Sequence, residues 1–210
     1  KITDSDNFVN AIIINSGIAN ACTKDMGMEC CMQSAVKAAN ELGVNENSIL
    51  LASTGVIGWQ LPIDKICKGI EGLSKSLMQS ERYATEAAMA IMTTDTVSKE
   101  IAIEFETGGK IVRMGAMCKG SGMIHPNMCT MLGFITTDIN ISKELLLKAL
   151  REDVEDSFNM VSVDGDTSTN DSLIILANGL ADNEKITDEN SDEYNLFKSN
   201  LNYITTSLSK

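Results

Sequence analysis

The sequence predicts a mixed α/β (α+β) sandwich, in which sheet layers are flanked by helices. Two observations predict this class. Strand-like and helical segments alternate through residues 8–92, as they do in α/β layers. Residues 100–117 then hold two strand-like runs around a Gly-Gly pair, the signature of a hairpin, and further strands and helices follow. The combination indicates mixed sheets and not a regular doubly wound sheet.

The first elements are two strands separated by a helix. Residues 8–15 (FVNAIIIN) form a β-branched run that ends at a Ser-Gly turn, and residues 48–53 (SILLAS) form a second run closed by a Thr-Gly step. Between them, residues 25–42 place apolar side chains at helical spacing and stop at Gly43, a typical C-cap. We expect strand, helix and strand in this order.

Two helices and the hairpin come next. Residues 61–77 begin with Leu-Pro, and proline is favoured in the first helical turn. Residues 80–92 form the following helix. Residues 100–107 and 110–117 flank the Gly-Gly pair, and glycine accepts the positive φ angles of tight hairpin turns. These two runs therefore predict paired antiparallel strands.

The remaining chain consists of strands around an amphipathic helix. Residues 142–158 form this helix, with the first serine as its N-cap. Residues 131–136, 160–163 and 173–177 are apolar runs and are expected to be strands. Residues 182–192 are acidic and are expected to be a solvated connection to a last helix.

Composition and charge exclude several classes of partner. The 210 residues are 43% hydrophobic, enough for a sizeable core, and carry a net charge of −12. Nucleic acids and anionic membranes bind clustered Lys and Arg, so neither is expected as a partner. The six cysteines include no Cys-x-x-Cys pair and His125 is the only histidine, so we expect no metal site. Cysteines in apolar segments indicate a reducing compartment, and we expect a cytoplasmic protein.

One polar loop has the pattern of a phosphatase nucleophile. In VSVDGDTST (residues 161–169) an apolar run precedes Asp164 and Asp166, of which the first would attack phosphorus and the second would act as acid and base. The later Lys and acidic metal site of such enzymes do not follow. A calcium loop is excluded because Ile175 stands where a Glu is needed. The alternative is a polar turn whose Asp and Thr side chains bond the backbone.

Two glycine-containing stretches are weaker candidates. Gly115, Gly120 and Gly122 lack the spacing of a dinucleotide or P-loop motif and indicate backbone freedom around a tight site. Thr54 and Gly55 close a predicted strand. A Thr hydroxyl and a Gly N–H at that place would suit an oxyanion, although strands often end in such residues.

The strongest candidate is a Cys-Thr step. In KGSGMIHPNMCTMLGF (residues 119–134), a Gly/Pro loop leads to Thr130 where an apolar strand begins. Attack of the Thr130 hydroxyl on the carbonyl of Cys129 would convert the peptide to an ester, and hydrolysis would make Thr130 an N-terminus. Its α-amino group, with a pKa of about 7.7–8.0, would activate its own hydroxyl, so His125 is expected to be a solvated loop residue. An ordinary strand start is the alternative, since Thr favours strands.

Five stretches together resemble one enzyme family. They are NSGIANACT (residues 15–23), ASTGVIG (52–58), AIMTTDT (90–96), KGSGMIHPNMCTML (119–132) and FNMVSVDGDTSTND (158–171). In this order, they resemble ornithine acetyltransferase, the bifunctional glutamate N-acetyltransferase of arginine biosynthesis. Family members extend beyond both ends of this sequence. Residues 1–210 are therefore expected to be a single catalytic-domain fragment that lacks N- and C-terminal parts.

The resemblance implies a self-processing N-terminal-Thr nucleophile enzyme. Family members cleave themselves before a threonine and remain together as a heterotetramer of two α and two β chains. Thr130 matches that threonine, so residues 1–129 would be the α-chain part and residues 130–210 the start of the β-chain. Cys129 stands where the family commonly has Ala. Cleavage uses only the carbonyl group of this residue, so we expect it to persist.

The resemblance also implies a reaction. Thr54 and Gly55 match the oxyanion pair, and Thr93, Lys119 and Thr130 match substrate-binding positions, where Lys119 suits a carboxylate. The acetyl group of N-acetylornithine would pass to Thr130 and then to glutamate by ping-pong catalysis, without a cofactor. Some members also accept acetyl-CoA as the donor. The expected partners are these small molecules.

Two alternative functions remain open. A related self-cleaving amidase or aminopeptidase would share the nucleophile but hydrolyse its substrate. A non-catalytic metabolite-binding relic would keep the pocket without turnover. Faster release of ornithine in the presence of glutamate separates the first alternative from the transferase, and self-cleavage separates the second.

Overall fold

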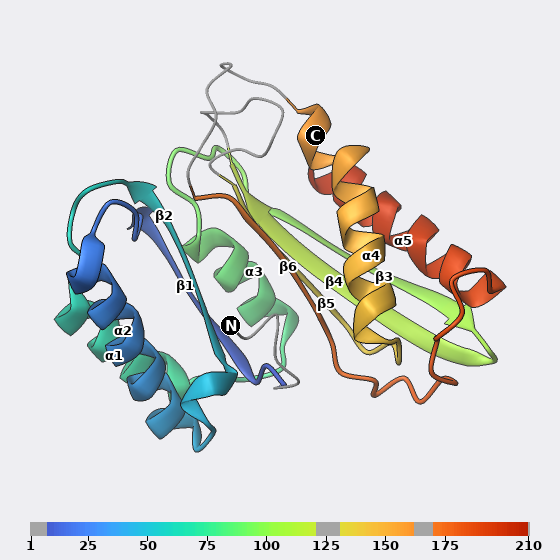
Figure 1. Cartoon of the computed structure of the whole chain (residues 1–210), viewed down its shortest axis with the longest axis horizontal. Coiled ribbons are helices and arrows are strands. Elements are labelled where there is room, and N and C mark those ends of the chain that lie inside the picture. Colours follow the sequence, from blue (N-terminus) through green and yellow to red (C-terminus); the bar gives the residue numbers. More distant parts are fainter. Residues whose placement is uncertain (1–7, 121–130, 162–169, 210) are drawn as a thin grey trace. The chain divides into compact units, whose positions relative to one another are not determined.

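Strands and helices alternate in the first of the two units into which the chain divides, Lys1–Thr93 and Thr94–Lys210. The computed structural model describes residues 8–120, 131–161 and 170–209. The elements of the first unit, shown in Figure 1, are β1 (Ala11–Ile18), α1 (Lys24–Leu42), a 3-10 turn (Glu46–Ser48), β2 (Ile49–Val56), α2 (Ile63–Ser74) and α3 (Glu81–Ala90). β1 and β2 pair in parallel, so α1 is the crossover that joins them.

The helix boundaries of this unit follow the local sequence. α1 ends at Gly43, which adopts φ 67° and donates its N–H to the carbonyl of Ala39. Only glycine takes this left-handed conformation at little cost, which confirms the predicted C-cap. Pro62 immediately precedes α2, as its fixed φ favours. The core beneath α1 and α2 is small and contains Ala38, Ala39, Ile49 and Ile70.

Both strands of this unit extend through glycines that were predicted to end them. β1 begins at Ala11, after a Phe8 that is 87% exposed, and continues to Ile18. β2 continues to Val56. The register places Gly17 opposite Gly55, and a Cβ on Gly55 would lie 2.2 Å from the carbonyl carbon of Gly17. These glycines therefore serve close backbone approach between paired strands and not a turn.

A four-stranded mixed sheet forms the second unit (Figure 1). Its elements are β3 (Lys99–Thr107), β4 (Lys110–Lys119), β5 (Leu132–Thr137), α4 (Lys143–Glu155), a 3-10 turn (Phe158–Met160), β6 (Ser172–Ala177) and α5 (Asp192–Leu208). The strand order is β3-β4-β5-β6. β4 is antiparallel to both β3 and β5, whereas β5 and β6 are parallel. The prediction of mixed sheets with flanking helices is confirmed in this unit.

Local signals set the ends of these elements. Gly108 and Gly109 have φ angles of 56° and 71°, so the hairpin between β3 and β4 turns through two left-handed residues, as predicted. The Ser142 hydroxyl accepts the N–H of Leu145 and caps α4. The helix ends at Glu155, three residues before its predicted end. α4 and α5 pack with the sheet around Met114, Phe197 and Leu201.

Two predicted segments differ from the structure. Met160, expected to begin a strand, belongs to the 3-10 turn Phe158–Met160, and Val161 is not in a strand either. The connection through residues 182–192 is not wholly solvated. Ile186 is buried and forms a parallel bridge with Ile141, and the Asn183 side chain bonds the backbone of Asn140. Ile186 and the Asn183 side chain thus attach this otherwise acidic segment to the residues around Asn140 and Ile141.

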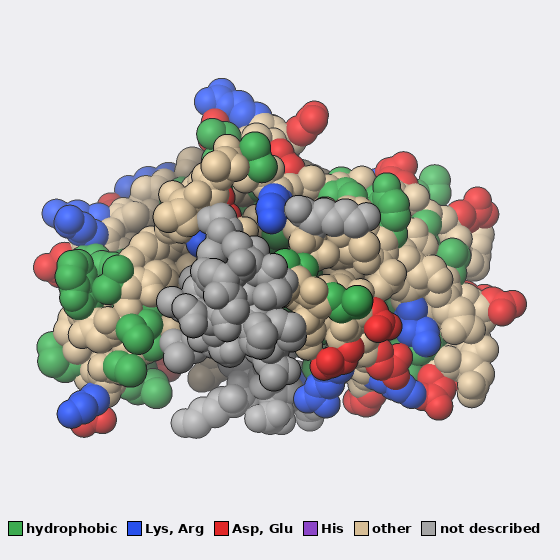
Figure 2. Space-filling model, turned by 90° about the horizontal axis from the view of Figure 1, so that it is seen from above, with side chains coloured by type: hydrophobic (Ala, Val, Ile, Leu, Met, Phe, Trp, Pro, Cys, Tyr) green, Lys and Arg blue, Asp and Glu red, His purple; other side chains and the backbone are tan. Residues whose placement is uncertain are grey.

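Within residues 8–120, 131–161 and 170–209, no helix combines the length and apolar character needed to cross a bilayer. On the face shown in Figure 2, Lys and Arg side chains are scattered among acidic and neutral ones. This distribution agrees with the acidic balance of the sequence.

Candidate active site

Thr54 lies at the C-terminal end of β2 and carries a buried hydroxyl. The residue is 0% exposed, and its Oγ1 has no hydrogen-bond partner among the residues that the structure describes. A buried hydroxyl without a partner costs about 1–3 kcal/mol. Exceptions to the pairing of buried polar groups are few in proteins, and a functional role is one explanation for them. The group is a donor suited to a ligand oxygen.

Gly55, the predicted oxyanion partner of Thr54, has a structural reason of its own to be glycine. Its φ of 130° lies in a region that side chains rarely adopt, and its Cα faces the backbone of Gly17. Any Cβ at this position would overlap that backbone. Close strand packing therefore accounts for the glycine whether or not its N–H binds an oxyanion.

The segment that leads to Thr93 is fastened to the same strand end. Ser16 is the register partner of Thr54, and its hydroxyl donates a 2.6 Å hydrogen bond to the carbonyl of Ile91. Thr93 follows two residues later and is exposed. The first unit thus brings the oxyanion candidates and one predicted substrate residue to one end of β1 and β2.

Lys119, the last residue of β4, belongs to the second unit and is held in a buried ion pair. Its Nζ lies 3.6 Å from Oδ2 of Asp95, and the two side chains are only 4% and 3% exposed. Asp95 Oδ1 also accepts the N–H of Gly120 at 2.6 Å. Burying a charge is costly unless it is paired, so Asp95 makes the buried position of the Lys119 ammonium possible.

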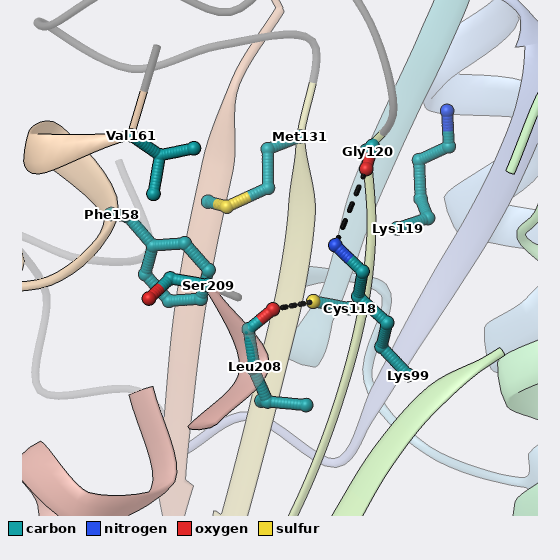
Figure 3. Close-up of a pocket in the computed structure, with 9 residues that line it drawn as sticks. All are labelled: Lys99, Cys118, Lys119, Gly120, Met131, Phe158, Val161, Leu208 and Ser209. Carbon is teal, nitrogen blue, oxygen red and sulfur yellow. Dashed lines mark hydrogen bonds between the residues drawn. The ribbon is translucent and has the colours of Figure 1, made fainter. Parts of the chain in front are cut away.

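A cavity beside Lys119 is apolar and small. Figure 3 shows Met131, Phe158 and Val161 on one side of it, while the Lys119 side chain points away from them. Its volume of about 30 Å³ is that of roughly one water molecule, too little for an amino-acid derivative. Cys118 at its wall donates to the carbonyl of Leu208, and burial raises the pKa of this thiol to about 11. The thiol is therefore neutral at pH 7 and not a nucleophile.

Several predicted site residues lie outside the described residues. They are Gly122, His125, Cys129, Thr130, Asp164 and Asp166. Their roles stay predictions. Gly115 lies within β4, opposite Ala102 and Thr136, so the three glycines do not form one loop. In the described part of the chain, no cluster of His, Cys, Asp and Glu could hold a metal ion.

Two carboxylates near the predicted site residues were not predicted from the sequence. One is Asp95. The other is Asp171, whose Oδ1 accepts the N–H of Met131 at 2.8 Å. Both lie inside stretches that carried the family resemblance. Nothing in the sequence distinguishes a carboxylate that accepts a backbone N–H from a solvated one.

The fold and these strand-end sites define a mixed α/β protein of a known type. The crystal structure of arginine biosynthesis bifunctional protein ArgJ from Bacillus halodurans superposes with a TM-score of 0.50 at 40% identity, over 56% of this chain and 61% of that chain. The ArgJ family model matches residues 1–210, and the chain belongs to the ArgJ family. The resemblance stated from the sequence is thereby confirmed.

Curated relatives agree with this family. The chain is 53% identical over 210 residues to arginine biosynthesis bifunctional protein ArgJ 1 of Clostridium acetobutylicum, covering 100% of this chain and 50% of the relative. It is 52% identical over 178 residues to the ArgJ protein of Symbiobacterium thermophilum, covering 85% of this chain and 44% of the relative. The chain thus spans about half the length of the curated relatives it matches.

Proposed function

We propose that the whole protein is a glutamate N-acetyltransferase that moves the acetyl group of N-acetylornithine to glutamate in arginine biosynthesis. The carrying observation is the match to the ArgJ family across all 210 residues, with relatives named as bifunctional proteins of arginine biosynthesis. Because the chain spans half of those relatives, the described residues supply only part of the machinery.

The first proposed step is self-cleavage. The Thr130 hydroxyl attacks the carbonyl carbon of Cys129, and the peptide nitrogen becomes the α-amine of Thr130 as the ester forms. Water then hydrolyses the ester, which leaves a carboxylate on Cys129 and a hydroxyl and an amine on Thr130. The cleavage divides the chain at the predicted boundary, after residue 129 and before residue 130.

The second proposed step is acetyl transfer. The α-amine of Thr130 accepts the hydroxyl proton while Oγ attacks the acetyl carbonyl, and ornithine leaves with that proton. The α-amine of glutamate then attacks the acetyl-Thr ester and restores the hydroxyl. We assign the developing oxyanion to the Thr54 hydroxyl and the Gly55 N–H. The buried Thr54 donor supports this assignment.

Lys119 and Thr93 complete the proposed substrate contacts. An ammonium group pairs with the α-carboxylate that both amino-acid substrates carry. The buried pair with Asp95 holds the Lys119 ammonium at the end of β4. Thr93 supplies a hydroxyl at the strand end that carries Thr54. The transfer needs no cofactor, and acetyl-CoA is a second acetyl donor in this proposal.

Assembly and location are also proposals. We infer a cytoplasmic heterotetramer of two α and two β chains. The cysteines that the structure describes, Cys22, Cys30, Cys31, Cys67 and Cys118, are all free thiols, which agrees with a reducing compartment.

The test uses the full-length protein with N-acetylornithine, with and without glutamate. We expect glutamate to accelerate ornithine release and N-acetylglutamate to form in equal amount. Release of ornithine together with free acetate, at a rate unaffected by glutamate, would establish the amidase alternative. No release at all would establish the binding relic. Adding acetyl-CoA and glutamate alone tests the second donor, and magnesium with a simple phosphate ester tests the phosphatase pattern.

A further inference from the structure

Two aspartates bond the backbone at both ends of the segment that holds the predicted cleavage bond. Asp95 accepts the N–H of Gly120 at 2.6 Å, and Asp171 accepts the N–H of Met131 at 2.8 Å. Gly120 and Met131 are the described residues on either side of residues 121–130. Each contact is a charge-assisted hydrogen bond, which is stronger than one between neutral groups.

The sheet topology places the two aspartate contacts at the same end of the sheet. Lys119 and Leu132 are register partners, so Gly120 and Met131 continue β4 and β5 at one end of the antiparallel pair. β3 begins at that same end, because Lys99 faces Cys118, and β6 begins there too, because Ser172 faces Leu132. Asp95 precedes β3 and Asp171 precedes β6. Each outer strand thus contributes an acceptor to the inner strand beside it.

Asp95 also carries a charge that the backbone contact alone does not require. A neutral acceptor would also satisfy the N–H of Gly120, yet a carboxylate is buried here opposite the Lys119 ammonium. One oxygen of Asp95 holds the backbone and the other faces the charge that would bind substrate. Lys99 strengthens the same point, because its Nζ donates to the carbonyl of Gly120 at 3.5 Å (Figure 3).

We propose that Asp95 and Asp171 are positioning residues that fix both ends of the segment carrying the predicted nucleophile, and that Asp95 also orients Lys119. The inference rests on the proposed function. Met131 directly follows the predicted nucleophile in the sequence, and its N–H belongs to the planar peptide unit that joins the two residues. Neither aspartate touches the reacting atoms in this proposal.

The two aspartates should give different kinetic signatures in the full-length protein. Asp95→Asn keeps an oxygen for the Gly120 N–H but removes the charge beside Lys119. We expect KM for N-acetylornithine to rise about 10-fold or more while kcat changes little, the pattern of lost uniform binding. Asp171→Ala should slow self-cleavage about 10-fold or more, as small misplacement of reacting groups does. Asp171→Asn, which retains an acceptor, should restore most of that rate.

The matched control is Asp138→Ala. Asp138 accepts the N–H of Arg113 at 2.7 Å, so it is the same kind of contact at the opposite end of the same strand pair. We expect the control to cleave and to turn over like the wild type. An equal loss in the control would reduce Asp95 and Asp171 to ordinary strand anchors and overturn the inference.

Other outcomes separate the inference from the proposed function. An active wild type whose Asp95→Asn and Asp171→Ala variants keep wild-type KM and cleavage rate would overturn the inference alone. A wild type that neither cleaves nor transfers acetyl groups would overturn both. If Asp95→Asn does not fold, the ratio of cleavage rates between Asp171→Ala and Asp171→Asn still decides, with a ratio near one contradicting the inference.

Discussion

The two units hold their predicted site residues in different ways. In the first unit, every residue of β1 is only partly buried, and the buried cluster beneath α1 and α2 has four small or aliphatic members. In the second, β5 is almost wholly buried and the described core contains fifteen residues, among them Phe197, Tyr194 and Leu201. The first unit fixes Thr54 by close approach of two backbones, and the second fixes Lys119 by depth and a paired charge.

The two units should therefore be destabilised by different kinds of substitution. A thin layer has few side-chain contacts to lose, so its geometry depends on glycines that let the strands meet. A thick core loses many contacts when one side chain is shortened. Substitutions in the two units therefore test whether they differ in this way.

The largest effect is expected in the deep core of the second unit. Ile204 is 0% exposed, and Ile204→Ala should lower the free energy of unfolding by about 4 kcal/mol, near the upper end for such changes. Ile70→Ala in the first unit should cost about 2 kcal/mol, because the shallow layer can relax into the space. Urea unfolding of the full-length variants measures both. Equal losses would contradict the contrast between the two cores.

Thr54→Val tests whether the buried hydroxyl serves catalysis. Removing one oxyanion donor lowers kcat by about 10²–10³-fold, or roughly 2.7–4 kcal/mol. The free energy of unfolding should stay the same or rise, because Val removes a buried hydroxyl that lacks a described partner. Acetyl transfer and thermal unfolding are measured on the same preparation. A less stable variant with wild-type kcat would make Thr54 a structural residue.

Gly55→Ala tests the close approach of β1 and β2. The new Cβ would overlap the Gly17 backbone at a φ of 130°, so we expect a loss of at least about 2 kcal/mol in unfolding free energy. Gly69→Ala is the matched control. Gly69 lies in α2 with open space around its Cα, and Ala should be neutral or stabilise by up to about 1 kcal/mol. Similar melting temperatures for the two variants would refute the packing role of Gly55.

The smallest effect concerns Asp153, which α5 covers. Burial raises the pKa of this carboxyl above its ordinary 3.8, although Asn202 and Ser157 donate hydrogen bonds to it. A raised pKa favours the folded state below pH 3.8, and this contribution is lost as pH rises through the folded pKa. Asp153→Asn lacks this titration. Its unfolding free energy relative to wild type should therefore increase with pH above 3.8, by about 1 kcal/mol or less, and a constant difference would contradict the assignment.

Sequence patterns predicted the elements of both units well where local chemistry decides. The Gly43 cap, the Gly108-Gly109 turn and the Ser142 N-cap each depend on neighbouring residues alone. Gly17 was predicted as a turn residue and Gly55 as a strand end, because their packing role depends on a partner strand about 38 positions away. The 3-10 turn at Met160 likewise replaces an apolar run that matched a strand pattern.

The site was predictable to the extent that the family resemblance carried it. Motifs identified Thr54 and Lys119, and the structure places both at strand ends in buried surroundings. Asp95 and Asp171 were not predicted, because their partners are backbone N–H groups that come close only when the sheet has formed. Contacts of this kind produce no recognisable pattern of residue spacing in the sequence.

The central claim is that this chain is part of a self-processing threonine enzyme. The most direct measurement is the intact mass of the full-length gene product, with N-terminal sequencing of every fragment. The account predicts two fragments, the second beginning Thr130-Met131-Leu132. A single uncut chain that stays intact at neutral pH would contradict it, and Thr130 would lose its assignment as the nucleophile.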